Sequence, residues 1–96
     1  MTLIEEERRN RIRLSIAACA YEFKDTTIMS DAEFDKLSSL IRPEVETGHK
    51  VLDDFFKTQF NPCTGQWVYA HPELTKLILK TEYIINLINK EKGEHQ

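Results

Sequence analysis

One short stretch of the sequence, YEFKDTTIMSDAEFDKL, gathers oxygen-bearing side chains at Tyr21, Asp25, Asp31 and Asp35. Asp31 and Asp35 are four residues apart, so on a helix both carboxylates lie on one face. Together with Asp25 they could attract Mg²⁺ or accept hydrogen bonds from ribose hydroxyls. A purely structural role for Asp31 is equally open, because the dipole of a helix stabilises a carboxylate in its first turn.

Cysteine and histidine residues form no metal-binding motif. Cys63 and His71 are separated by seven residues, while Cys19 and His49 lie far from both in sequence. Without Cys-x-x-Cys or His-x-x-x-His spacing, a structural zinc site is not expected. A nucleophilic Cys63–His71 pair stays open, against a thiol that is simply exposed on a turn. We expect no metal, and we expect the protein not to be an enzyme.

Negative charge is concentrated in the middle of the chain. Residues 20–56 contain nine acidic and four basic residues, a balance of −5, so the remainder of this −3 chain sums to +2. An acidic segment repels nucleic acid and favours a basic partner. Two arginines of the basic run RRNRIR form i,i+4 pairs with preceding glutamates, Glu5–Arg9 and Glu7–Arg11. These pairs indicate a solvated helix face rather than a nucleic-acid site.

Two capping boxes predict where helices begin. The pairs are Thr2 with Glu5 and Ser30 with Glu33. The first helix is expected over residues 3–23, with Ile12, Ile16, Ala20 and Phe23 facing the core at helical spacing. The second should end before Pro43, since the residue before a proline avoids the helical conformation. Its apolar stripe consists of Phe34, Leu37, Leu40 and Ile41.

The stretch FNPCTGQWVYA differs in character from the helices around it. It is preceded by a third expected helix, over residues 50–57. Asn-Pro and Thr-Gly are turn dipeptides, and the Trp-Val-Tyr run favours extended structure. We therefore predict a small β-hairpin with residues 58–60 facing residues 66–68. Pro72 suits the first turn of a last helix, which should continue to Lys90.

Length and composition are typical of one small globular domain, residues 1–96. Hydrophobic residues make up 41% of the chain and charged residues 30%. No apolar run approaches the roughly 20 residues that a membrane span needs. The stretch MTLIEEERRN has no apolar signal core, and two cysteines do not make a disulfide framework. We therefore expect a cytoplasmic protein with free thiols.

The stretch AYEFKDTTIMSDAEFDKL resembles the N-terminal helical hairpin of NAD-dependent DNA ligases, which carries a Tyr-His…Asp…Asp-x-Glu-Tyr-Asp pattern. The resemblance covers about residues 14–41. In that family the hairpin binds the nicotinamide mononucleotide half of NAD, and the resemblance assigns these contacts to Tyr21, Asp31 and Asp35. Glu22 stands where the family has histidine, and Phe34 where it has tyrosine. The carboxylate should repel a phosphate, and the missing hydroxyl removes a hydrogen bond worth about 1 kcal/mol.

The rest of the chain does not resemble a ligase. The Lys-x-Asp-Gly adenylation motif is missing from the sequence, so the nucleophilic lysine is absent. The chain looks like the short ligase-related proteins of phages and prophages, with a ligase-like hairpin over about residues 3–41 and an unrelated part over about residues 48–90. The predicted fold is mainly α, with four helices and a short β-hairpin between the third helix and the fourth.

Two functions follow as hypotheses. In the first, this is a non-catalytic, phage-derived module that binds and modulates or inhibits a host nucleic-acid-handling or defence complex, for example as an anti-CRISPR protein. Its contacts with a basic partner surface would be Glu22, Asp25, Asp31 and Asp35. In the second, nicotinamide mononucleotide or NAD binds through Tyr21, Asp31 and Asp35. Direct binding to nucleic acid or to a membrane is not expected.

Overall fold

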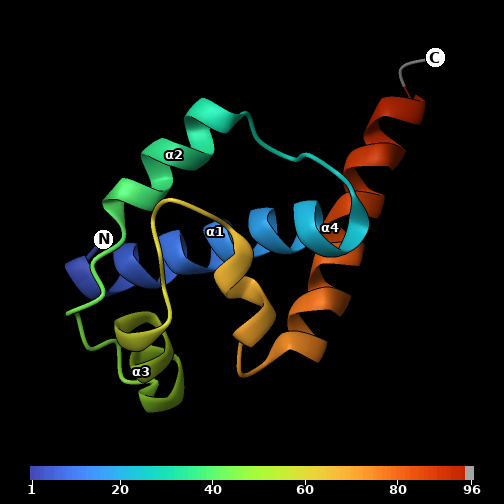
Figure 1. The fold of residues 1–96 in the computed structure, drawn as a ribbon. Helices are drawn as coiled ribbons and strands as arrows, with labels where there is room; N and C mark the ends of the chain where they lie inside the picture. Colours follow the sequence, from blue (N-terminus) through green and yellow to red (C-terminus); the bar gives the residue numbers. More distant parts are fainter. Residues whose placement is uncertain (95–96) are drawn as a thin grey trace.

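The computed structural model describes residues 1–94. Within this range the chain forms α1 (Leu3–Lys24), α2 (Asp31–Leu40), α3 (Lys50–Thr58), the 3₁₀ helix η1 (Gln66–Ala70) and α4 (Leu74–Glu94). The predicted mainly α fold with four α-helices is confirmed. In Figure 1, α1 runs through the middle of the molecule, α2 and α3 lie on either side of it, and α4 crosses near its C-terminal end. No described helix is long and apolar enough to cross a membrane.

Both predicted helix starts are confirmed by their caps. The Oγ1 atom of Thr2 accepts a hydrogen bond from the backbone N–H of Glu5 at 3.1 Å. The Oγ atom of Ser30 accepts one from the N–H of Glu33, also at 3.1 Å. Each cap satisfies a backbone donor that the first turn of a helix leaves without a partner. The local sequence therefore fixes where α1 and α2 begin.

The predicted β-hairpin is wrong, because residues 1–94 contain no strand. Residue 58 ends α3, and residues 66–68 belong to η1. Trp67 and Val68 are both buried, with exposed fractions of 5% and 0%. Neighbouring residues of a strand point to opposite faces, so a strand could not bury both against one core. The turn that precedes η1 is closed by Asn61, whose Oδ1 accepts from the N–H of Cys63 at 2.9 Å.

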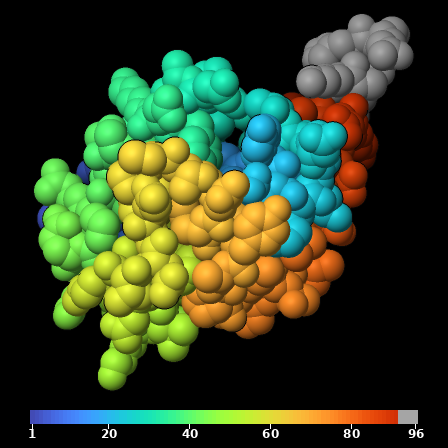
Figure 2. Space-filling model, in the orientation of Figure 1, coloured from blue at the N-terminus to red at the C-terminus, as the bar shows by residue number. Residues whose placement is uncertain are grey.

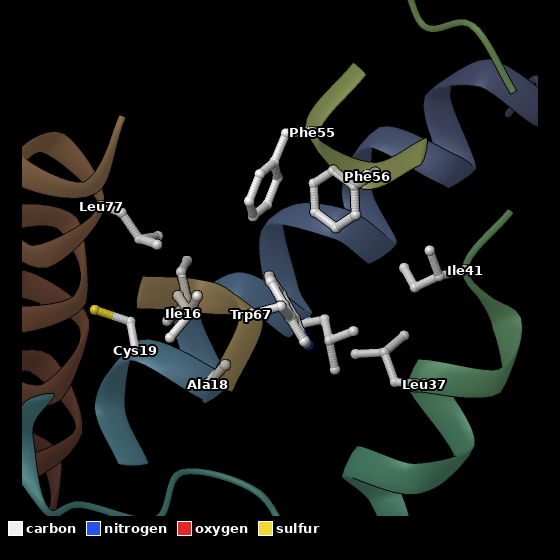
Figure 3. Packing of buried hydrophobic residues seen from close by; sticks show 11 residues of the cluster. Ile16, Ala18, Cys19, Leu37, Ile41, Phe55, Phe56, Trp67 and Leu77 are labelled. Carbon is white, nitrogen blue, oxygen red and sulfur yellow. The ribbon is translucent and has the colours of Figure 1, made fainter. Parts of the chain in front are cut away.

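Trp67 lies in the middle of the hydrophobic core (Figure 3). Its ring centroid is 6.1 Å from that of Phe55, 5.6 Å from Phe56 and 5.3 Å from Phe60. Leu37 of α2 and Leu77 of α4 belong to the same buried cluster. One core therefore joins α1 and α2 to the C-terminal part of the chain.

A buried charge network connects α1 to α3. Arg11 donates from Nε to Glu7 at 2.7 Å and from Nη1 to Asp53 at 2.8 Å. Its Nη2 donates to the carbonyl oxygens of Arg42 and Val45. Glu7 and Arg11 are only 2% and 4% exposed, so the prediction of a solvated face is wrong for this pair. Because each of the three guanidinium nitrogens donates a hydrogen bond, the burial of the Arg11 charge is compensated.

Candidate binding site beside the α1–α2 connection

A cavity of about 270 Å³ lies where the C-terminal part of α1, the connection 25–30 and the first turns of α2 meet the segment 64–66. Figure 2 shows the surface hollowed at this place. Ala17 and Ala18 of α1 contribute small side chains to its wall. We call this hollow the hairpin cavity.

The turn after α1 sets the position of the connection. Asp25 adopts the left-handed conformation, with φ of 49°, and its backbone N–H bonds to the carbonyl of Ala20. The N–H of Thr26 bonds to the same carbonyl at 3.0 Å. Asparagine, aspartate and glycine tolerate this conformation better than other residues. Asp25 therefore has a structural role in addition to its charge.

The opposite wall of the cavity is formed by the segment that contains Gly65. A Cβ atom at this position would lie 3.4 Å from the Cβ of Ala18 and 3.4 Å from the Cζ of Phe34. A Cβ atom here would thus make ordinary van der Waals contacts, which shows that the segment 64–66 packs directly against α1 and α2. The sequence does not indicate that this segment lies beside Tyr21 and Asp31. Its one local signal was the Thr64-Gly65 turn dipeptide, which does not indicate which helix the turn approaches.

The structure brings some of the predicted site residues together and separates others. Tyr21, Glu22 and Asp31 line the hairpin cavity. Asp25 and Asp35 are exposed but do not line it. Tyr21 is 63% exposed, so its ring lies at the cavity mouth rather than in the core.

The carboxylates of this region have no cationic partner. Among the ion pairs of residues 1–94, none includes Glu22, Asp25, Asp31 or Asp35. Lys24, the one basic residue between Tyr21 and Asp35, is paired instead with Glu82 of α4. The surface around the connection therefore carries uncompensated negative charge.

The structure does not bring Cys63 and His71 into hydrogen-bond contact with each other within residues 1–94. Cys63 lies exposed on the turn before η1. Nδ1 of His71 instead accepts from the backbone N–H of Glu73 at 3.0 Å. In residues 1–94 no group of three or more His, Cys, Asp or Glu side chains is placed to hold a metal ion.

No family model matches the chain, and neither the curated proteins nor the solved structures contain a match to it. The resemblance to the ligase hairpin therefore stays a prediction that rests on the residues quoted above.

Proposed function

We propose that this protein is a non-catalytic protein-binding module. It binds a basic surface of its partner through the acidic surface formed by Glu22, Asp25, Asp31 and Asp35. The observation that carries the proposal is that these four carboxylates lack ion-pair partners in the described structure. By contrast, Asp53 forms an ion pair with Arg11 inside the fold.

Uncompensated surface charge contributes mainly to the rate of association. Like charges repel within the folded protein, but an opposite charge on a partner steers the encounter and raises the association rate. The partner class follows from charge as well. A complex that handles nucleic acid presents basic surfaces, because it must neutralise phosphates. A small acidic domain that occupies such a surface would inhibit the complex.

The proposal includes a phage origin and a host defence complex, such as a CRISPR surveillance complex, as the target. This part rests on the resemblance of residues 14–41 to the N-terminal hairpin of NAD-dependent DNA ligases, and of the chain to the short ligase-related proteins of phages and prophages.

The test begins with a pull-down from host lysate and mass-spectrometric identification of the partner. Association rates are then compared between the wild type and a Glu22→Gln, Asp25→Asn double variant. Asparagine is chosen because a lysine at the left-handed position 25 would strain the turn. We expect association to slow by roughly three- to tenfold at low salt, with a flatter dependence on salt.

The matched control is a Glu44→Gln, Glu46→Gln double variant, which removes the same charge from exposed positions outside the acidic surface. Circular dichroism checks that all variants are folded. If both double variants slow association equally, only net charge matters. If neither does, the acidic surface is not the contact. Either result rejects the proposed interface.

Nicotinamide mononucleotide is the second candidate ligand. It is favoured by one observation: Tyr21 and Asp31 line the same cavity as Glu22 and Phe34, the two positions that differ from the ligase pattern. Against it, the volume of about 270 Å³ lies below the range of roughly 300–1,000 Å³ found for most small-molecule sites. We expect titration calorimetry with nicotinamide mononucleotide to give weak or no binding. A low-micromolar dissociation constant that Asp31→Asn abolishes would place this function first.

A further inference from the structure

A second, larger cavity of about 490 Å³ lies between α1, α3 and the N-terminal half of α4, and it shares no lining residue with the hairpin cavity. Its apolar wall includes Ile12, Leu52, Phe56 and Leu77. Ile12 was expected in the core, but 47% of its surface is exposed. An aliphatic side chain is thus left open to solvent inside a concave site, where an apolar ligand would cover it. We call this site the cationic cavity.

Positive charge surrounds this apolar wall. Arg8, Lys76 and Lys80 line the cavity with Glu73 as the single carboxylate among the lining residues, a balance of +2. Arg11 also lines the cavity, but it is left out of this charge balance because its guanidinium is paired with Glu7 and Asp53.

The cations at the mouth are weakly compensated within the fold. No carboxylate of residues 1–94 forms an ion pair with Arg8 or Lys80. The Nζ of Lys76 lies 3.7 Å from Glu73, but its side chain is 83% exposed, so this pair is largely screened by water. The structure therefore leaves positive charge available at the mouth of the cavity.

The position of Arg8 is fixed by the neighbouring backbone. Its Nη2 donates to the carbonyl oxygen of Thr47. The next residue is Gly48, with φ of +94°, and a Cβ atom there would lie 3.2 Å from Nη2 of Arg8. Glycine at this position therefore accommodates both the left-handed backbone and the close guanidinium. A cation held in this way loses less conformational freedom when it binds an anion.

Two histidines, His49 and His71, also line the cavity. Nδ1 of His71 accepts from the N–H of Glu73, and Nδ1 of His49 accepts from the N–H of Leu52 at 3.4 Å. In a neutral ring whose Nδ1 is an acceptor, Nε2 carries the proton and donates. Burial lowers the pKa of His71 below its ordinary value of 6.5, although the Glu73 carboxylate opposes this effect. His71 is therefore a neutral donor at pH 7.

We propose that the cationic cavity binds a small molecule that joins an apolar ring or chain to one anionic head group, such as an aromatic carboxylate or sulfonate. The apolar body lies against Ile12, Leu52 and Phe56, and the head group lies near Arg8 and Lys80. This proposal is independent of the acidic surface and of its protein partner.

The probe for the test is 8-anilinonaphthalene-1-sulfonate, an aromatic sulfonate whose fluorescence rises in an apolar site. It is titrated into the full chain and into a Lys76→Gln, Lys80→Gln double variant. The control is Lys57→Gln, Lys90→Gln, which removes two exposed lysines outside the cavity. We expect the dissociation constant to rise about fivefold or more in the cavity variant, and less than about twofold in the control.

Two further experiments test the anionic head group and the apolar wall separately. The anion 2-naphthoate should displace the probe, while 2-naphthylmethylammonium, with a similar ring and the opposite charge, should not. Ile12→Asn should weaken probe binding, whereas Val51→Asn, at an exposed position outside the cavity, should leave it unchanged. Equal effects of the two lysine variants, or equal displacement by the two competitors, would overturn the proposal.

Discussion

Asp53 accepts three hydrogen bonds at a buried position. Its partners are Nη1 of Arg11 at 2.8 Å, the Oγ1 of Thr47 at 2.7 Å and the backbone N–H of Thr47 at 2.9 Å. Burial by itself would raise the pKa of Asp53, but the hydrogen bonds from Thr47 together with Arg11 lower it below its ordinary value of 3.8. The folded state therefore releases this proton more readily than the unfolded chain does.

The lowered pKa predicts how an Asp53→Asn variant depends on pH. Below about pH 4 the unfolded chain binds this proton more tightly, so the stabilisation from ionised Asp53 is present above that pH and is lost as the pH falls through the folded pKa. At pH 7 the variant should be less stable by about 1–3 kcal/mol. The difference in unfolding free energy, measured with urea, should shrink toward pH 2. A difference that stays constant from pH 7 to pH 2 would contradict this role.

At the scale of the elements, α2 packs against α1, and Ser30 caps the N-terminus of α2. Phe34 of α2 is half-buried and packs on the edge of the core. It also lines the hairpin cavity. One side chain therefore contributes to both the docking of α2 and the shape of the site.

Phe34→Ala should destabilise the fold moderately. Full burial of a phenylalanine would predict a loss of about 3–5 kcal/mol, and partial burial reduces the expectation to about 1–2 kcal/mol. Thermal unfolding followed by circular dichroism measures the change. Leu40→Ala, at an exposed position of the same helix, is the control and should have a smaller effect. An unchanged midpoint for Phe34→Ala would mean that the ring is free to contact a ligand.

The helices could be predicted from sequence because their signals are local. Thr2 and Ser30 mark helix starts, because each hydroxyl accepts a hydrogen bond from the backbone N–H three residues later. Pro43 disfavours the helical conformation at the residue before it. The face that each helix buries was harder to predict. Periodicity places Ile12 on an apolar face, but it does not reveal that this part of α1 borders a cavity.

The buried charge network and the η1 turn could not be predicted, because both depend on residues far apart in sequence. Glu7 and Arg11 have the spacing of an exposed helical pair, and only the fold brings Asp53, 42 residues beyond Arg11, to the guanidinium. Trp67 and Val68 favour a strand by propensity, yet the core that they fill is formed by residues of all four α-helices. Tertiary contacts override local preference in both cases.

At the scale of the whole molecule, a single core predicts a single unfolding transition. The only tryptophan of the chain, Trp67, lies among aromatic residues of α3 and close to α1. Its fluorescence therefore reports on the core, while far-ultraviolet circular dichroism reports on the helices. Urea unfolding curves from the two signals should coincide. Two separated transitions would mean that the hairpin of residues 3–41 and the part from residue 48 unfold independently.

The two cysteines make this protein suitable for site-specific labelling. Cys19 is fully buried, whereas Cys63 lies exposed on the turn that leads into the segment 64–66. A maleimide dye should therefore react with Cys63 while the fold is intact, and with Cys19 only after unfolding. A dye on Cys63 would lie next in sequence to a wall of the hairpin cavity. The natural chain thus offers a fluorescent reporter of events at that cavity without any substitution.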